Sequence, residues 1–328
     1  MLLKLVEYHW AEHIEDALLL LGRLDVKTVP LAGGTYLLGV RDEHIQAVVD
    51  LRDLQLAYIE DSSNNNSNYL RIGAMTTLQT LSEAPQLKGI GIDVFSQAAH
   101  ASASSRLIRN SATIGGTVAT GPVSQADLLT ALVALDAEIV VRSGSRTQVN
   151  LSGGSTDRPG LALSGVVFKG RQERRIASST FELERRPNEL ITEIAIPRPL
   201  TACGTSFQRV SRAPSDAALL NAVALVEIEN GLYKRVRLAF GGVNMEPVRV
   251  TAIEQQLEGQ PAAQPVSSNT LQAIVRNGIP LFRPPTDVRV SGSYRRVSGA
   301  NLAFHALEEA INSAHWRSSV ASGTGRDV

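Results

Sequence analysis

The chain has 328 residues, of which 43% are apolar, a length that suits two or three compact units. Lysine plus arginine and aspartate plus glutamate each number 32, so the formal net charge is zero, and aromatic residues make up only 5%. A nucleic-acid-binding surface normally carries a basic excess and stacking aromatic side chains, so this composition argues against DNA or RNA as a partner.

The sequence predicts a chain without membrane spans. No apolar run approaches the roughly 18–20 residues that a helix needs to cross a bilayer. The first residues lack the long apolar segment of a signal peptide, and we therefore expect a cytoplasmic protein. Cys203 is the only cysteine, which excludes an intrachain disulfide and an iron–sulfur cluster held by cysteines of this chain alone.

Short helices and strands alternate through the first part of the chain. Residues 14–21 carry apolar side chains at helical spacing, and Gly22 can cap this helix at its C-terminus. Thr76 or Thr77 can cap a second, shorter helix. Strands are expected at 28–31, 47–51, 69–74 and 138–142, helices at 93–105 and 126–135, and loops at 61–68 and 143–160.

The composition changes near Pro197 and Pro199, and we place a domain boundary there. Beyond it, Asn230-Gly231 separates two apolar runs and is the strongest short-range hairpin signal in the chain. The elements expected around and after the boundary are strands at 190–196, 217–228 and 232–240, helices at 250–257, 270–275 and 301–313, and a disordered tail from Ser318.

Two glycine-paired segments, Leu31–Leu37 and Ala112–Val118, are the most informative motifs. Adjacent glycines let a ligand approach the backbone and permit positive φ, and successive N–H groups in such a turn form a nest for phosphate oxygens. The alternative for either segment is a glycine-rich turn between strands. Together they favour one extended ligand with a pyrophosphate at its middle. The chain has no G-x-G-x-x-G after its first strand and no P-loop motif, which excludes those nucleotide-binding modes.

One motif competes with this interpretation. His9, Glu12 and His13 match H-x-x-E-H, the inverted zinc-peptidase pattern. Zinc catalysis would need both histidines on one helical face. His9 precedes the expected helix start near Ala11, so we expect these residues on the surface at a strand-to-helix junction instead.

Two arginine pairs, Arg185-Arg186 and Arg295-Arg296, are expected on solvated faces. Contact with an acidic partner is the alternative for either pair.

Further motifs accompany the glycine segments through about residue 315. They are Ala32-Gly33-Gly34-Thr35, Leu70–Ala74, Ile108–Gly116, Glu189–Ile194, Arg212 with Asp216, and Phe240–Val243. With these motifs the chain resembles the FAD-binding subunit, or middle domain, of molybdenum hydroxylases such as xanthine dehydrogenase, carbon monoxide dehydrogenase and aldehyde oxidoreductases. The Thr-Ile-Gly-Gly motif with its preceding Arg-Asn is more specific than the C-terminal pieces.

The resemblance implies an α+β fold. A two-lobed PCMH-type FAD-binding domain is expected at 1–198, with lobes at about 1–56 and 57–198. A small C-terminal antiparallel sheet with helices, the flavoprotein domain of carbon monoxide dehydrogenase type, is expected at 199–315, followed by a disordered tail at 316–328.

The resemblance also implies the cofactor and its contacts. Backbone N–H groups would bind the FAD pyrophosphate, with the Thr35 and Thr113 hydroxyls adding bonds and Val118–Thr120 near the flavin ring. Asp127 would contact the sugar-alcohol chain, or cap the following helix, or both. Arg109 would neutralise phosphate or, in the favoured alternative, hold backbone carbonyls. The implied cofactor-binding residues are Leu31, Ala32, Gly33, Gly34, Thr35, Tyr36, Leu37, Thr113, Ile114, Gly115, Gly116, Thr117 and Asp127, with no catalytic residue or metal ligand in this chain.

The chain departs from the family pattern at three positions: Thr117 where asparagine is usual, Gln208 where xanthine dehydrogenases have lysine, and Ala103 where they have phenylalanine. A lower affinity for FAD is one expected consequence.

The expected function is that of an electron-transfer subunit, because flavin carries the redox chemistry and the protein supplies binding and orientation. Partner chains would hold two [2Fe–2S] clusters and the molybdopterin cofactor, in a dimer of heterotrimers. Electrons would leave through FAD to NAD+, a quinone or oxygen, and the substrate is not determined by this chain. The alternatives are a cofactor-poor structural subunit and a free-standing FAD oxidase.

Overall fold

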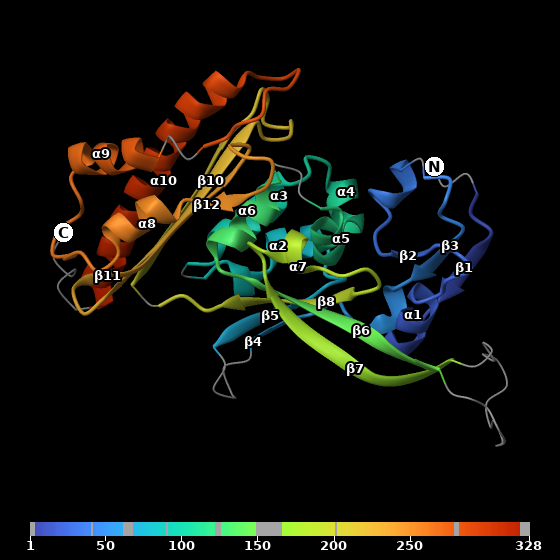
Figure 1. The fold of residues 1–328 in the computed structure, drawn as a ribbon. Coiled ribbons are helices and arrows are strands. Elements are labelled where there is room, and N and C mark those ends of the chain that lie inside the picture. Colours follow the sequence, from blue (N-terminus) through green and yellow to red (C-terminus); the bar gives the residue numbers. More distant parts are fainter. Residues whose placement is uncertain are drawn as a thin grey trace.

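The computed structural model of the chain describes residues 4–40, 42–61, 68–89, 91–121, 126–148, 166–200, 202–278 and 282–321. Within these ranges the strands form three separate sheets, with helices packed between and around them (Figure 1). The predicted α+β class, with a C-terminal antiparallel sheet and helices, is therefore confirmed. None of the described helices combines the length and apolar character that a membrane span requires.

The N-terminal lobe is a small parallel sheet with one covering helix. Its elements are β1 (Glu7–Trp10), α1 (Ile14–Leu21), β2 (Thr28–Leu31), β3 (Ala47–Asp50) and the 3-10 turns η1 (Leu37–Gly39) and η2 (Arg52–Leu54). The strand order is β1-β3-β2, and the central strand β3 is buried along its whole length. Leu18 and Leu21 of α1 share an apolar cluster with Val49 of β3, which fixes the helix on the sheet.

The second lobe combines an antiparallel sheet with a layer of short helices. Its strands, in spatial order, are β4 (Ile59–Asp61), β5 (Tyr69–Gly73), β8 (Leu190–Pro197), β6 (Glu138–Gln148) and β7 (Val166–Ala177). Its helices are α2 (Leu78–Glu83), η3 (Pro85–Leu87), α3 (Asp93–Ala101), α4 (Arg106–Ser111), α5 (Ile114–Ala119), α6 (Asp127–Ala134) and α7 (Phe181–Glu184). One apolar cluster joins Ile72 of β5 and Ile194 of β8 to Phe95 of α3 and Leu132 of α6, so the helices cover one face of this sheet.

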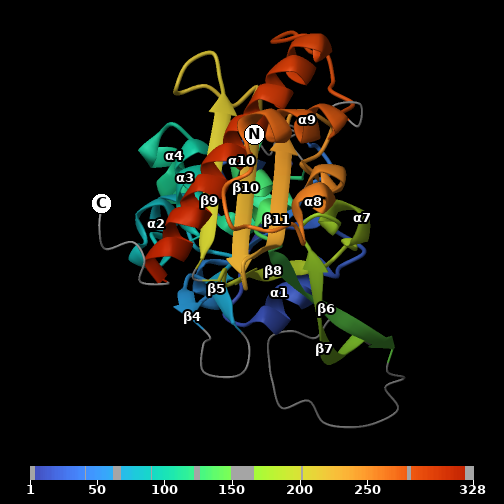
Figure 2. The same cartoon turned by 90° about the vertical axis from the view of Figure 1, so that its left-hand side faces the viewer.

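The C-terminal part is a four-stranded antiparallel sheet between two helical layers (Figure 2). Its elements are β9 (Cys203–Val210), β10 (Leu220–Glu229), β11 (Leu232–Gly241), β12 (Val248–Arg249), α8 (Thr251–Leu257), α9 (Ser268–Gly278) and α10 (Gly292–Ala321). Val223 and Leu225 face the core that contains α3 and α6, whereas Ala222 and Ala224 face the core of α8, α9 and α10. The period-two alternation of β10 thus serves two cores, which explains why the strand is apolar on both sides.

Several local predictions are confirmed by the caps and turns. Asn230 and Gly231 have φ values of 53° and 73°, the pair of positive angles that a two-residue hairpin of type I′ requires. Thr77 caps α2 by accepting a hydrogen bond from the Thr80 amide. Gly22 ends α1 as expected and donates to the Leu18 carbonyl.

Several boundary predictions are wrong. The helix expected at 301–313 is the longer α10, which begins at Gly292, and the helix expected at 93–105 ends at Ala101. The loop expected at 143–160 begins later, because residues 143–148 extend β6 through pairing with β7. The disordered tail expected at 316–328 is helical through Ala321, and the Arg317 guanidinium donates to the Cys203 carbonyl, which ties the end of α10 to β9. The remaining predicted loop and tail residues, 62–67, 149–160 and 322–328, lie outside the described ranges.

An ion-pair network joins the second lobe to the C-terminal sheet. Asp136, which follows α6, accepts hydrogen bonds from Arg237 of β11 (2.7 Å) and Arg249 of β12 (2.8 Å). Arg249 also binds Glu254 of α8 (2.6 Å), and Arg237 binds Glu258 (2.6 Å). Because one carboxylate serves two arginines from two strands, the network fixes the sheet against the end of α6.

The predicted surface position of Arg295 is wrong. Its side chain is fully buried in α10, and burial lowers the pKa of its guanidinium. It donates to the carbonyls of Leu219 and Gly242 and to the Asp287 carboxylate (2.9 Å). Arg296 is exposed, as expected. Of these two adjacent arginines, Arg295 is therefore buried and hydrogen-bonded within the fold, and Arg296 lies on the surface.

We expect Arg295→Met to lower the free energy of unfolding by about 2–4 kcal/mol, because two buried carbonyls lose their donor. Urea denaturation of the purified chain measures the loss. The matched control is Arg296→Met, which should change stability by less than about 0.5 kcal/mol. Equal losses in both variants would contradict the assignment.

Candidate cofactor-binding site

The two glycine segments lie against each other. The first follows β2 in the N-terminal lobe, and the second opens α5 in the neighbouring lobe. A Cβ placed on Gly33 would lie 1.7 Å from the carbonyl oxygen of Ser111, which ends α4. Figure 1 shows α4 and α5 on the side of the second lobe that faces β2. The missing side chain at Gly33 lets the two backbones touch, and so brings together the segments that the sequence pairs.

The first segment presents backbone N–H groups that the protein does not use. Gly34 has a φ of 70°, and its carbonyl accepts from the Leu38 amide (3.0 Å), so the chain turns back on itself. Within the described ranges, the amides of residues 33–36 donate to no protein acceptor. Gly33 and Gly34 are half-buried, and Thr35 and Tyr36 are exposed. Successive unpaired amides at a turn are suited to an anion such as phosphate.

The second segment is a helix start rather than an open nest. Thr113 caps α5, Gly115 and Gly116 lie inside the helix, and neither glycine has a positive φ. The amides of residues 114–117 all have acceptors in the chain. These acceptors are, in order, Thr76 O (3.0 Å), Ala74 O (2.8 Å), Thr113 Oγ1 (3.1 Å) and Thr113 O (2.9 Å). The second segment is therefore not a nest of unpaired N–H groups, and of the two glycine pairs only the first contains a positive φ, at Gly34.

The two glycines of α5 differ in their packing. A Cβ on Gly115 would lie 2.7 Å from the Ala74 Cβ and 2.8 Å from its carbonyl oxygen, so glycine is needed for α5 to sit on the end of β5. A Cβ on Gly116 would meet only the Thr113 hydroxyl, at 3.0 Å. Gly116 thus leaves a bare helix surface, and the Thr117 hydroxyl is already bonded to the Thr113 carbonyl (2.9 Å).

Arg109 holds backbone carbonyls, as the favoured alternative predicts. Its guanidinium donates to the carbonyls of Ala103 (2.6 Å) and Ser104 (3.0 Å) and to the Gln79 side chain (2.9 Å). Only 6% of the residue is exposed. Arg109 therefore fixes the turn before α4, and so the position of Ser111 against Gly33.

Asp127 is the first residue of α6, and its carboxylate makes no cap bond. The carboxylate points across the domain boundary instead. It accepts from the Asn221 amide group of β10 (2.5 Å) and lies 3.5 Å from Arg209 Nε of β9. The residue is 3% exposed, and this burial raises the pKa of the carboxyl to about 6, against the opposing effects of Arg209 and Asn221. The helix-cap alternative is not observed.

Arg209 and Asn221 were not predicted as site residues. Arg209 also donates to the carbonyls of Pro214 (3.2 Å) and Asp216 (2.8 Å), so it holds the loop after β9. Asn221 is fully buried and accepts from the Gly241 amide (2.8 Å). The sequence signal that could have identified Arg209 is the period-two alternation of β9, because the odd-numbered residues of this strand face α3 and α6.

Gln208 lies on the opposite face of β9. Its side-chain amide donates to Glu309 of α10 (2.7 Å), and Ser206 donates to the same carboxylate (2.7 Å). On the other face, Thr205 donates to Asp93 of α3 (3.0 Å). Gln208, one of the three positions that differ from the family pattern, therefore faces α10 and not the helices that carry the predicted cofactor residues.

The histidine motif does not form a shared face. His9 lies in β1 and binds Glu7 (2.8 Å), whereas His13 precedes the first turn of α1. The predicted strand-to-helix junction is confirmed. Among the residues that the structure describes, no group of three or more His, Cys, Asp or Glu side chains could hold a metal ion.

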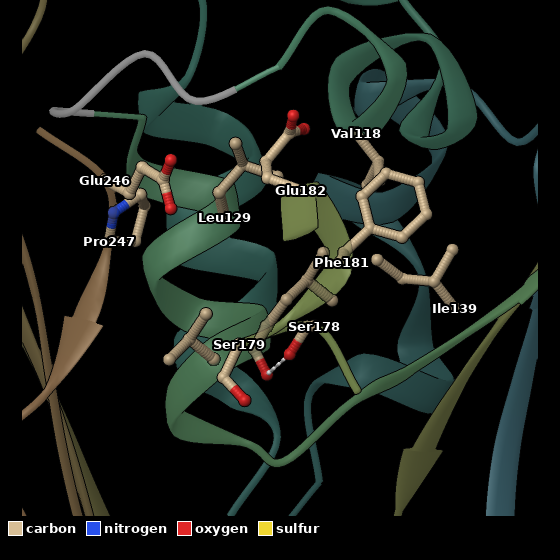
Figure 3. Close-up of a pocket in the computed structure, with 11 residues that line it drawn as sticks. Val118, Leu129, Ile139, Ser178, Ser179, Phe181, Glu182, Glu246 and Pro247 are labelled. Atoms are coloured by element: carbon tan, nitrogen blue, oxygen red, sulfur yellow. Dashed lines mark hydrogen bonds between the residues drawn. The ribbon is translucent and has the colours of Figure 1, made fainter. Parts of the chain in front are cut away.

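A small apolar pocket of about 40 Å³ lies beside the end of α5 (Figure 3). Val118 and Phe181 form one wall, and Leu129 of α6 forms another. Glu182 and Glu246 also line the pocket. Burial raises the pKa of the Glu182 carboxyl; the negative charge of Glu246 acts in the same direction, and the positive charge of Arg185 opposes it. The pocket is too small for a dinucleotide, so it is a packing gap under the stretch that continues the second glycine segment.

Comparison with known families matches both parts of the chain. Residues 4–156 match the FAD binding domain in molybdopterin dehydrogenase, and residues 205–310 match the CO dehydrogenase flavoprotein C-terminal domain.

Full-length relatives give the same result. The glyceraldehyde dehydrogenase medium chain of Sulfolobus acidocaldarius is 27% identical over 306 residues, with 92% of this chain and 97% of the relative covered. The putative xanthine dehydrogenase FAD-binding subunit of Escherichia coli is 27% identical, with 94% and 96% covered. The solved carbon monoxide dehydrogenase of Hydrogenophaga pseudoflava contains a chain of the same fold, with a TM-score of 0.78, 23% identity and coverage of 95% of this chain and 99% of that one.

The fold and the two matched domains define an FAD-binding flavoprotein of the oxidoreductase class. The chain belongs to the FAD-binding medium subunits of the molybdenum hydroxylase family, which includes the carbon monoxide, xanthine and aldehyde dehydrogenases. It is thus an oxidoreductase subunit with an FAD-binding domain.

We expect Gly33→Ala to lower the free energy of unfolding by about 2–3 kcal/mol, because the new Cβ overlaps the backbone at Ser111 and no rotamer change relieves it. Thermal unfolding of the purified chain measures the loss. Gly39→Ala is the control, since a Cβ at Gly39 meets nothing within 4 Å. Similar stabilities for the two variants would mean that the lobes do not meet at Gly33.

The raised pKa of Asp127 predicts a pH-dependent stability. The folded chain binds the Asp127 proton more tightly than the unfolded chain does. Ionisation of Asp127 therefore lowers the free energy of unfolding, fully above pH about 6 and progressively less as the pH falls towards 3.8. Relative to Asp127→Asn, the wild type should gain up to about 3 kcal/mol across that window, at about 1.4 kcal/mol per pKa unit. Urea denaturation of both proteins at pH 5 and pH 7.5 tests this. A constant difference between them would refute the raised pKa.

Proposed function

We propose that this chain carries FAD as the electron-transfer subunit of a multi-subunit molybdenum hydroxylase, and passes electrons from [2Fe–2S] clusters on a partner chain to an external acceptor. The observation that carries the proposal is the turn at residues 33–36, whose amides have no protein acceptor within the described ranges. That turn lies in the matched FAD binding domain and is pressed against the second glycine segment.

The residues present fit a dinucleotide. The amides of Gly33, Gly34, Thr35 and Tyr36 are available to the diphosphate oxygens, and the bare helix surface at Gly116 lets a ligand approach the backbone. The neighbouring residues Leu31, Ala32 and Leu37 and the helix start at Thr113–Thr117 would complete the walls. The second segment would contribute shape and hydroxyl groups, because its amides are engaged within the chain.

The residues beside this turn would orient the rest of the cofactor. Asp127 would accept a hydrogen bond from the sugar-alcohol chain, and Asn221 and Arg209 would hold its carboxylate in place. Val118–Thr120 would lie near the ring. When bound, FAD supplies the ability to accept and release electrons singly or in pairs, which the side chains of this protein cannot do.

The proposed partners follow from the likeness to the medium chains of glyceraldehyde and carbon monoxide dehydrogenases. On that likeness, the clusters and the molybdopterin would belong to two other chains, in a dimer of heterotrimers. The composition agrees with the first part, because iron–sulfur clusters need about four thiolates and the sequence has one cysteine, which is buried. We further propose the division into a FAD-binding domain at 1–198, with lobes 1–56 and 57–198, and a C-terminal domain at 199–315, since each of the three described sheets lies within one of these segments.

We expect Gly116→Val to remove most of the bound flavin while the chain remains folded, because the valine methyl groups project from the bare face of α5 and a Cβ there meets only the Thr113 hydroxyl. Flavin absorbance of the purified complex, per mole of chain, measures retention. Gly39→Val is the matched control and should retain flavin.

Three outcomes separate the alternatives. A wild type without flavin indicates the cofactor-poor subunit. A wild type that retains flavin and purifies without iron or molybdenum partners indicates a free-standing oxidase. Normal flavin content in Gly116→Val would remove the second glycine segment from the site.

A further inference from the structure

A residue from a distant part of the sequence hydrogen-bonds to the C-terminal end of α5. The last carbonyls of a helix have no intrahelical donors and need other partners. The Gly116 and Val118 carbonyls accept from the amides of Thr120 (3.1 Å) and Gly121 (3.3 Å). The Ala119 carbonyl accepts from the guanidinium of Arg185 (3.2 Å). Arg185 follows α7, so α7 is linked directly to the helix that contains the second glycine pair.

Arg185 is itself held in place on two sides. Its guanidinium lies 2.9 Å from the Glu182 carboxylate and 6.0 Å from the centre of the Phe181 ring. Phe181 is 5% exposed and lies beside Val118 in the wall of the apolar pocket (Figure 3). The short helix α7 therefore contacts the end of α5 twice, through an apolar wall and through a cation.

The charge of Arg185 suits its position. The C-terminal end of a helix carries a partial negative charge, and a cation there is favourable. The neighbouring Gly121 has a φ of 83°, and a Cβ on it would lie 3.8 Å from the Arg185 guanidinium and from the Glu182 carboxylate. The backbone thus turns away from α5 immediately beside the ion pair.

We propose that Arg185 is a positioning residue for the cofactor: by binding the Ala119 carbonyl it fixes the stretch from Val118 to Gly121 that continues the second glycine segment. This inference rests on the proposed function, in which that stretch lies near the flavin ring. In this proposal Arg185 acts through α5 and not through a bond of its own to the cofactor. The Arg185–Glu182 ion pair is partly open to solvent, and such pairs contribute little to global stability, so the effect of Arg185 should appear in cofactor affinity rather than in folding.

The test compares neighbouring arginines in the complex purified through this chain. FAD is titrated into the flavin-depleted complex, and the dissociation constant is measured by flavin fluorescence. We expect Arg185→Ala to raise the dissociation constant about five- to tenfold, the effect of losing one charged hydrogen bond at a helix end. Arg186→Ala removes the same charge one residue away and should change the dissociation constant less than about twofold, because within the described ranges the Arg186 side chain forms no hydrogen bond or ion pair, and only its backbone amide binds Glu189.

Two further variants sharpen the result. Arg185→Lys keeps the cation without the planar fork and should restore part of the affinity. Glu182→Gln removes the partner that orients Arg185 and should weaken FAD binding less than Arg185→Ala does. Unfolding temperatures of all flavin-depleted variants should stay within about 3 °C of the wild type.

The outcomes separate this inference from the proposed function. A wild-type complex that binds no FAD overturns both proposals. A wild type that binds FAD, with equal dissociation constants for Arg185→Ala and Arg186→Ala, overturns the role of Arg185 alone. A lower unfolding temperature for Arg185→Ala with an unchanged dissociation constant also overturns it, because that result describes a purely structural residue.

Discussion

The approach of two backbones at Gly33 is the constraint on which the site depends. A side chain at this position would overlap the Ser111 carbonyl, so the turn that leaves β2 can reach α4 only with glycine there. Arg109 holds the other side of the contact by binding two carbonyls in the turn before α4. The unpaired amides of residues 33–36 are thereby fixed beside a rigid helix start, and a ligand meets a preformed surface rather than two independent loops.

The C-terminal sheet also helps to position the helices of the second lobe. The Asp136 network fixes β11 and β12 against the end of α6, and Asn221 and Arg209 bring β10 and β9 to its first turn. Both ends of α6 are therefore held by the sheet. Since Asp127 is the predicted cofactor residue on that helix, its position depends on strands that lie far from it in the sequence.

How far the sequence predicted this arrangement can be seen from particular residues. Local signals were sufficient for the Asn230-Gly231 hairpin and for the Thr77 cap, because each depends on the chemistry of two to four residues. The pairing of the glycine segments was also predicted, although the engagement of the α5 amides by Thr76, Ala74 and Thr113 depends on tertiary contacts that no local pattern reports. The two arginine pairs show the same limit. Arg295 and Arg185 both donate to backbone carbonyls, although Arg295 is buried and Arg185 is exposed like Arg186 and Arg296, and nothing in the sequence distinguishes the members of each pair.

The buried carboxylate of Asp127 indicates why the domain boundary is polar at this point. An ionised group with a raised pKa destabilises the fold at neutral pH, and an apolar residue of similar size could replace it without that cost. The chain also places Arg209 Nε there, buried and without a hydrogen-bond partner. A buried guanidinium nitrogen without a hydrogen-bond partner is unfavourable for folding, because it has lost water without a full replacement. The contacts of Asp127 with Asn221 and Arg209 therefore join α6 to β10 and β9 at a cost in folding free energy that an apolar contact would not carry.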